Sequence, residues 1–167
     1  MKNLQVITMV VCGVMLLCAV SCNPGSNNNR NQRPVTRSGA GTGIPYEVAK
    51  GYFLRNDADP SVVRENPKIS DAQRFSELFG TAATMGRGGT PTAIDFSRQY
   101  VIAVTEEPTD LAARLEPVAL EKVDNDIILT YNYIFGQPQS YTMKPVLLIV
   151  VDNQYTGNIN LIRKAED

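Results

Sequence analysis

Four acidic side chains are the residues best suited to catalysis, because this chain has no histidine and no tryptophan. Asp95, Glu106, Glu107 and Asp110 lie close enough in the sequence to meet at one end of a sheet. A glycosidase needs an acid and a base held about 5 to 10 Å apart in a cleft. A carboxylate-dependent cell-wall hydrolase is therefore the enzymatic hypothesis for this chain.

Other catalytic and metal sites lack the side chains they need. Histidine usually activates a serine or cysteine nucleophile, so histidine-dependent hydrolases are excluded. No serine has a lysine three residues on, which removes the serine–lysine dyad, and the only cysteines are Cys12, Cys18 and Cys22. Asp124-Asn125-Asp126 lacks the glycine and glutamate of a calcium loop, and it predicts a hairpin turn instead. We expect no catalytic residue, metal or cofactor.

Residues 1–21 predict a signal peptide. Lys2 supplies a basic start, and residues 6–20 are almost entirely apolar. The sequence Ala19-Val20-Ser21-Cys22 resembles the lipobox of bacterial lipoproteins, which implies cleavage before Cys22 and a lipid on its sulfur. The resemblance further implies a palmitate-carrying, lipid-anchored membrane protein of the cell envelope, on the periplasmic or surface face of the outer membrane.

An uncleaved transmembrane helix or an ordinary signal peptide is the alternative for this segment. A span needs about 20 mainly apolar residues, and this run is close to that length. However, no Lys or Arg follows it before Arg30, whereas a stop-transfer segment carries positive charge near its cytoplasmic end. Asn23-Pro24-Gly25 also ends the helix at once. The flanking residues thus favour the lipoprotein.

The remaining chain divides into a tether and a domain. Residues 22–43 are rich in Asn, Ser and Gly, contain no aromatic side chain, and predict a flexible tether. Residues 44–167 predict a single α+β domain, large enough to build its own core. Losing Lys2 from the 16 basic residues leaves 15 against 17 acidic ones, with no basic run. A nucleic-acid partner is therefore not expected.

One packed helix and several strands are predicted within the domain. Residues 70–79 begin with an S-x-x-Q capping box, precede a glycine, and place Ala72, Phe75 and Phe79 on one stripe. Asp59-Pro60 opens a turn or a single helical turn. The expected strands are residues 48–54, 100–104, 115–123, 127–135, 146–151 and 159–162. The predicted fold class is α+β, with one antiparallel, twisted or partly closed β-sheet of about five to six strands and one packed α-helix.

Tyrosines and loops are the expected contact points for a protein partner. The tyrosines that would form an exposed patch are Tyr131, Tyr133, Tyr141 and Tyr155. Packing within the strands is the alternative role for these side chains. The loops at residues 81–92 and 136–140 are further contact sites, and edge strands can accept a partner strand.

The order of motifs is similar to the C-terminal domain of the PrcB protease-complex subunit family. The residues that carry the resemblance are Ile69-Ser70, Phe75, Leu78, Phe79, Ile94-Asp95-Phe96-Ser97, Val101-Ile102-Ala103-Val104, Pro108-Thr109 and Pro145. Asp110-Leu111-Ala112 departs from the family's Gly-Gly-Tyr. The resemblance covers roughly residues 68–165 and implies a non-catalytic α+β lipoprotein domain that accompanies or stabilises a protease or another envelope complex.

We therefore expect a membrane-tethered envelope lipoprotein that acts as a non-catalytic binding or accessory module, as a subunit or partner of a protease complex. The expected partner is another envelope protein. The alternatives are the carboxylate-dependent hydrolase and a lipid-binding or inhibitor-like envelope protein.

Overall fold

The computed structural model describes residues 43–82 and 89–165, and these belong to one compact unit. The predicted signal peptide, Cys22 and all but the last residue of the tether lie outside the described residues. So do residues 83–88 of the predicted loop at residues 81–92. Neither described helix has the length and apolarity that crossing a membrane requires.

The strands are distributed over three sheets. The central sheet has the order β1 (Tyr46–Ala49), β8 (Val146–Asp152), β5 (Gln99–Thr105) and β3 (Lys68–Ile69). The outer sheet has the order β6 (Thr109–Val123), β7 (Asp126–Met143) and β9 (Asn158–Arg163). The remaining elements are the pair β2 (Tyr52–Leu54) and β4 (Phe79–Thr81) and the helices α1 (Pro60–Glu65) and α2 (Ala72–Leu78).

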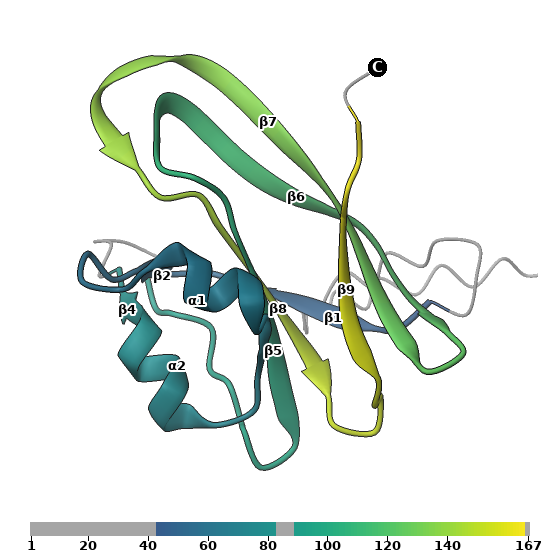
Figure 1. Cartoon of the computed structure of the whole chain (residues 1–167). Helices are drawn as coiled ribbons and strands as arrows, with labels where there is room; N and C mark the ends of the chain where they lie inside the picture. Colours follow the sequence, from purple (N-terminus) through teal and green to yellow (C-terminus); the bar gives the residue numbers. More distant parts are fainter. Residues whose placement is uncertain (1–42, 83–88, 166–167) are drawn as a thin grey trace, which may run out of the picture. The chain divides into compact units, whose positions relative to one another are not determined.

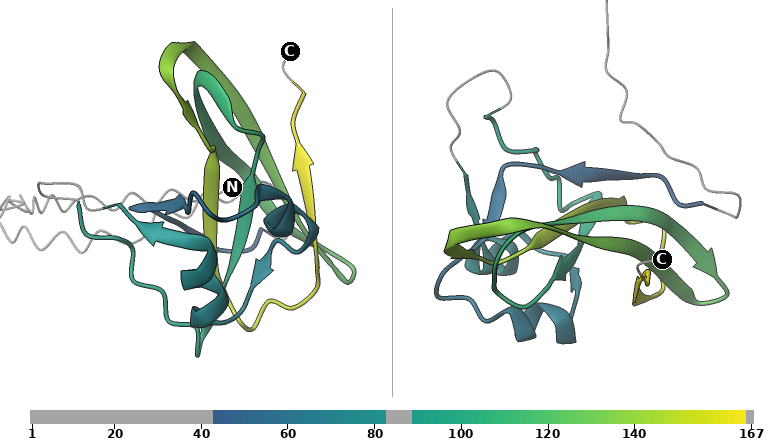
Figure 2. Two further views of the ribbon diagram at one scale, coloured as in Figure 1. Left: turned by 60° about the vertical axis from the view of Figure 1, so that its left-hand side comes forward. Right: turned by 90° about the horizontal axis from the view of Figure 1, so that it is seen from above.

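The predicted α+β class is confirmed, but the single antiparallel sheet is not. Among the described residues three sheets replace it, two helices are present, and β9 runs parallel to β7. The parallel pair arises because the chain leaves the central sheet after β8 and enters the outer sheet as β9, which runs beside β7 in the same direction. Figure 1 shows β9 on one side of β5 and β8 and the two helices on the other, with the long β6–β7 ribbon running across the molecule, and Figure 2 shows this ribbon from two further sides.

The central sheet is buried on both faces because its two inner strands are apolar at nearly every position. On β5, Tyr100, Ile102 and Val104 face the outer sheet, while Val101 and Ala103 face the helices. β8 alternates in the same way. The prediction that residues 146–151 form a central strand covered on both faces is therefore confirmed.

The helix at residues 70–79 was predicted with wrong ends. Asp71, not Ser70, caps α2, because its carboxylate accepts the Arg74 N–H at 2.7 Å. The helix ends one residue before Phe79, which is already extended and begins β4. Ala72 is exposed, so the buried side chains of α2 are Phe75 and Leu78.

Gly80 is not the helix-ending glycine that the sequence indicated. It lies in β4 opposite Phe53 of β2, and an added Cβ would lie 2.6 Å from the Phe53 ring. The ring therefore covers the glycine, an arrangement that stabilises a glycine in a strand.

The helical turn predicted at Asp59-Pro60 is confirmed as α1, since Asp59 caps the helix and Pro60 occupies its first turn.

The predicted first strand, residues 48–54, is divided between two sheets. Gly51 has a φ of 79°, which turns the chain out of β1 and into β2. An added Cβ there would lie 2.9 Å from the Pro91 Cα. A continuous strand is prevented because this left-handed backbone conformation cannot remain in a ladder.

The hairpin predicted around Asp124-Asn125 is confirmed, and it is longer than expected. β6 and β7 pair from Val123 opposite Asp126 back to Thr109 opposite Met143. The predicted loop at residues 136–140 is wrong, because these residues belong to β7. Register shifts near Leu111 show that extra β7 residues bulge out there, and such bulges bend a ribbon. We call residues 109–114 and 134–143 the arm.

Tyr100 allows a test of the core between the two large sheets. It is 1% exposed, and its hydroxyl has no hydrogen-bond partner among the described residues. Because burying an unpaired hydroxyl costs free energy, Tyr100→Phe should raise the free energy of unfolding by about 1 kcal/mol at neutral pH in chemical denaturation. Tyr131→Phe is the control, and it should destabilise the fold because it removes a hydrogen bond to Glu106.

The same variant should change the alkaline pH dependence. Burial raises the pKa of Tyr100 to about 12, whereas an unfolded tyrosine titrates near about 10. The unfolded state therefore loses its proton first, and stability falls as pH rises from about 10 to 12. The free energy of unfolding of the Tyr100→Phe variant should fall less steeply over this pH range. Equal slopes for the variant and the original chain would contradict the assignment.

Candidate functional site

Asp95 forms a turn before β5. Its Oδ1 accepts hydrogen bonds from the Ser97 hydroxyl at 2.6 Å and the Ser97 N–H at 3.0 Å. These bonds, the side-chain bond first, lower the pKa of Asp95. Because β5 separates Asp95 from Glu106, the two carboxylates lie roughly 20 Å or more apart along the strand. The expected gathering of carboxylates is therefore wrong for Asp95.

The acidic residues after β5 also have contacts within the fold. Glu107 pairs with Arg64 of α1 at 2.7 Å. Glu106 accepts a hydrogen bond from the Tyr131 hydroxyl at 2.9 Å. Asp110 lies exposed at the start of β6. Glu106 is thus bonded to the outer sheet, whereas Glu107 is paired at the surface with α1.

Glu106 is the centre of a cluster that joins β5, β7 and β9. Arg163 Nη1 lies 3.8 Å from Glu106 Oε2, and the Arg163 guanidinium lies 4.7 Å from the centre of the Tyr133 ring. Burial and the Glu106 bond raise the pKa of Tyr131 to about 12, so its hydroxyl stays neutral and donates. The cluster holds the end of β9 against β7.

No sequence signal indicated this cluster, because its members are far apart in the chain and follow no local spacing. Only the parallel pairing of Tyr131 with Arg163 brings them together. The one related feature in the sequence was a charged residue, Arg163, at the end of an apolar strand. Such a residue is common at strand ends and does not by itself indicate a cluster.

The four tyrosines do not form one exposed patch. Tyr131 and Tyr133 are 7% and 6% exposed and pack in the core, so the prediction is corrected for them. They point inward because alternate residues of β7 face the central sheet. Tyr155 is half-buried against the same core, and Tyr141 is 63% exposed on the arm. Packing within strands, the alternative, describes Tyr131 and Tyr133, whereas Tyr155 packs from the turn between β8 and β9.

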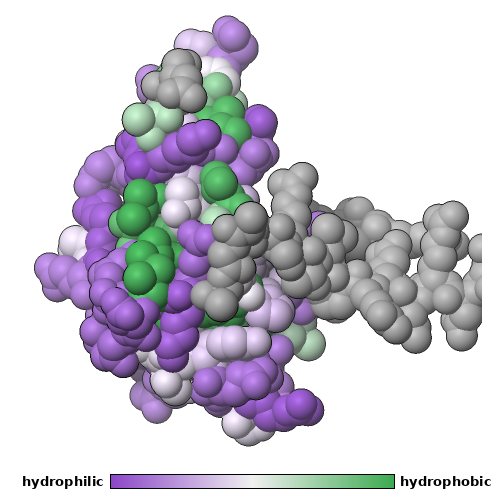
Figure 3. All heavy atoms as spheres, turned by 90° about the vertical axis from the view of Figure 1, so that its right-hand side faces the viewer, coloured by the Kyte–Doolittle hydropathy of each residue, from purple (hydrophilic) through white to green (hydrophobic). Residues whose placement is uncertain are grey.

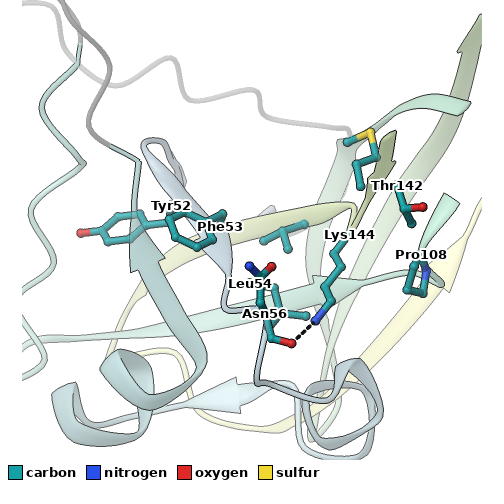
Figure 4. A pocket seen from close by; sticks show the side chains of 9 residues that line it. Tyr52, Phe53, Leu54, Asn56, Pro108, Thr142 and Lys144 are labelled. Atoms are coloured by element: carbon teal, nitrogen blue, oxygen red, sulfur yellow. Dashed lines mark hydrogen bonds between the residues drawn. The ribbon is translucent and has the colours of Figure 1, made fainter. Parts of the chain in front are cut away.

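A surface pocket of about 510 Å³ lies where the arm meets β2 (Figure 4). The residues that line it are Tyr52, Phe53, Leu54, Asn56, Pro108, Thr142, Met143, Lys144 and Val146. The hydroxyl of Tyr52 points away from the other lining side chains in Figure 4, and it donates to the Thr92 carbonyl at 2.7 Å. The pocket therefore has a mixed lining, in which Asn56, Thr142 and Lys144 accompany the apolar side chains.

Lys144 has a structural role at the edge of this pocket. Its Nζ donates to three carbonyl oxygens, those of Arg55 and Asn56 at 3.1 Å and that of Ala58 at 3.0 Å. An ammonium group has three N–H donors, so all of them are used. Lys144 thus closes the turn between β2 and α1, and it is not placed as a nucleophile.

Within residues 43–82 and 89–165, no three acidic side chains come together as ligands for a metal ion. Asp126, one of the acids considered for calcium, accepts a hydrogen bond from the Asn158 side chain at 3.0 Å. Asp124 has a φ of 52°, a conformation that Asp tolerates in a tight turn. The hairpin interpretation of Asp124-Asn125-Asp126 is confirmed.

Comparison with protein-family models, with curated proteins and with solved structures finds no match to this chain.

Apolar side chains reach the surface on several elements. The large ones that are at least two-fifths exposed are Phe53, Val62, Val118, Val123, Phe135, Tyr141 and Ile162. Figure 3, which views the side where β9 lies, shows hydrophobic residues at the surface among hydrophilic ones. Phe53 also lines the pocket beside the arm.

Proposed function

We propose that this chain is a membrane-tethered envelope lipoprotein whose domain is a non-catalytic module that binds another envelope protein. The resemblance to the PrcB family favours a protease complex as the assembly that it joins. The lipobox-like sequence before Cys22 supports the anchor, because a lipid-modified cysteine keeps a protein at a membrane.

The observation that carries the proposal is the engagement of the candidate catalytic side chains. Of the four candidates, Asp95 is bonded within its own turn, Glu106 joins β7 and β9, and Glu107 pairs with Arg64 at the surface. Asp110 is exposed at the start of β6, apart from Asp95. A general acid or base must instead be available to a substrate at a suitable distance. These polar groups therefore support the fold, and the exposed apolar groups remain for recognition.

The arm and its pocket are the surface that we assign to the partner. Phe135 and Tyr141 are 40% and 63% exposed on the arm, and Phe53 is 46% exposed beside the pocket. Aromatic side chains dominate the energetics of protein interfaces. Gly43 pairs with Glu121 of β6, so the chain joins the outer sheet roughly 20 Å or more along β6 from the arm. Recognition and tethering thus use separate parts of the ribbon.

Cross-linking in cells tests this assignment. A photo-reactive amino acid at Tyr141 in the full chain should give a specific product with another envelope protein, identified by mass. The same group at Val123, which is 50% exposed at the hairpin turn, is the control and should give at least about tenfold less product. Equal labelling at both positions, or none at either, would contradict the proposed surface.

Activity assays separate the proposal from the hydrolase. The full chain should not turn over peptidoglycan fragments or peptides. If it did, and if Glu107→Gln abolished turnover without changing the melting temperature, the carboxylate enzyme would replace the binding module. Glu107 suits this test because its side chain is 76% exposed and its pairing with Arg64 is a surface contact.

The anchor makes a separate prediction. Cys22→Ala should abolish lipid attachment and leave the unprocessed precursor, because the cysteine is both the modified residue and the landmark for cleavage. Labelling cells with a radioactive fatty acid, followed by gel mobility, measures both effects. Ser26→Ala is the control and should keep normal label. Undiminished label in the Cys22 variant would remove the lipoprotein interpretation.

A further inference from the structure

β9 is an open edge of the outer sheet. It pairs with β7 on one side only, and its six residues contain no proline or glycine. The other edges of the two large sheets differ from β9: β6 has Pro117 at a register shift, and β1 and β3 are short strands of four and two residues. Proline and bulges prevent edges from pairing with other chains. β9 has neither form of protection.

The hydrogen bonds of β9 show which backbone groups face outward. The N–H of Asn158 donates to Asn125, and the N–H of Lys164 donates to Tyr131. In a parallel pair alternate residues bond to the partner, so the even-numbered residues face β7. Ile159, Leu161 and Arg163 therefore direct their N–H and C=O groups away from the sheet, where no described residue pairs with them.

The side chains of β9 suit an apolar neighbour. Ile159 and Leu161 are only partly buried against the core between the sheets, and Ile162 is 48% exposed on the opposite face. The guanidinium of Arg163 is held back by Glu106 and the Tyr133 ring. The edge thus offers both a free hydrogen-bonding ladder and uncovered apolar surface.

Charge is distributed unequally along this edge. At the start of β9, Asp126 lies beside Asn158, Asp124 is in the adjoining turn, and Lys122 bonds the Thr156 carbonyl. At the other end are Arg163, Lys164 and Glu106, which pairs with Arg163. The first end thus has an excess of one negative charge and the second an excess of one positive charge. A neighbouring copy in the same direction would place like charges together. An antiparallel copy instead brings the basic end of each strand beside the acidic end of the other.

We propose that β9 pairs antiparallel with β9 of a second copy of this chain, about a twofold axis at Leu161. Ile159 then bonds with the partner's Arg163, and Leu161 bonds with the partner's Leu161, so every outward-facing group is used. Asn158 lies opposite the partner's Lys164, near Asp126. In this register, odd-numbered residues lie opposite odd-numbered residues of the partner. The apolar face that covers the core therefore continues from one outer sheet into the other. This goes beyond the binding function, since it uses β9 and leaves the arm free.

Sedimentation of the full chain in detergent, over a roughly hundredfold range of concentration, tests the pairing. The fraction of the original chain that is dimeric should rise as its concentration rises. Ile162→Lys places a charge on the edge and should weaken dimerisation at least about tenfold. Val62→Lys is the matched control, because Val62 is 46% exposed on α1 and Ile162 is 48% exposed on β9. It should dimerise normally.

Cysteine cross-linking tests the register independently. Asn160 lies opposite the partner's Ile162, so the Asn160→Cys, Ile162→Cys double variant should form a disulfide-linked dimer on mild oxidation. Val62→Cys should give at least about tenfold less under the same conditions. Melting curves by circular dichroism identify any variant that fails to fold, and Asn160→Lys then replaces Ile162→Lys.

Two results would overturn the inference. One is a folded original chain that stays monomeric throughout the concentration range. The other is a dimer that Ile162→Lys and Asn160→Lys both leave intact. Neither result bears on binding through the arm, because the cross-linking at Tyr141 is measured separately.

Discussion

Phe75→Ala should lower the free energy of unfolding by about 3 to 5 kcal/mol, the cost of removing a buried phenylalanine. The ring is 7% exposed. Its centre lies 5.0 Å from that of Tyr52, 5.1 Å from Phe79 and 5.5 Å from Phe96. It therefore joins α2 to the β2–β4 pair and to the segment before β5. Chemical denaturation measures the loss.

Two further variants sharpen this test. Phe79→Ala should cost a similar amount, since Phe79 is 4% exposed in the same cluster. Val62→Ala on the exposed face of α1 should change stability by less than about 0.5 kcal/mol. A domain of this kind has only about 5 to 15 kcal/mol of stability to lose. If Phe75→Ala melted at the original temperature, α2 would not pack on the sheet as described.

Lys144→Met should be the second large effect, with a loss of about 2 to 3 kcal/mol in free energy of unfolding. The methionine keeps the length of the side chain but removes the three donors that bind the carbonyls of Arg55, Asn56 and Ala58. The turn between β2 and α1 then loses its internal partner. Denaturation reports the total loss, and amide hydrogen exchange locates it near residues 55–58.

Charge and geometry can be separated at the same position. Lys144→Arg keeps the charge, but a planar guanidinium does not direct three donors at one set of converging carbonyls. It should therefore restore only part of the lost stability. Lys50→Met, at an exposed position, is the control and should be nearly neutral. Equal stability for Lys144→Met and Lys50→Met would show that the three bonds contribute nothing.

Local patterns predicted the strands that lie deepest in the fold. Val146–Asp152 is apolar at almost every position, and the residues around Asp124 alternate on either side of a turn, so burial and the hairpin were both evident. α2 was found but its ends were not, since the S-x-x-Q pattern favoured Ser70 as the cap. In the structure the Arg74 N–H donates to the Asp71 carboxylate instead.

The division of residues 48–54 and the bulges of the arm were not predictable in this way. Each depends on a close approach between distant segments, such as Gly51 against Pro91 or Gly136 against Ala112. The clusters around Glu106 and Lys144 have the same origin. Their members come together through sheet pairing, so no spacing within the sequence could indicate them. The tyrosine patch failed because alternation along β7 determines exposure, whereas residue type does not.

The pairing of β1 with β8 restricts the order in which the chain can fold. Tyr46 lies opposite Val151, so the first strand made meets its neighbour only after nearly all the domain has been synthesised. The β6–β7 hairpin joins residues that are close in sequence and can form early. Closing the longer loop costs more chain entropy, so β1 should dock late. Until then one edge of β8 lacks its strand, and the unfinished domain is most open to proteases and to aggregation.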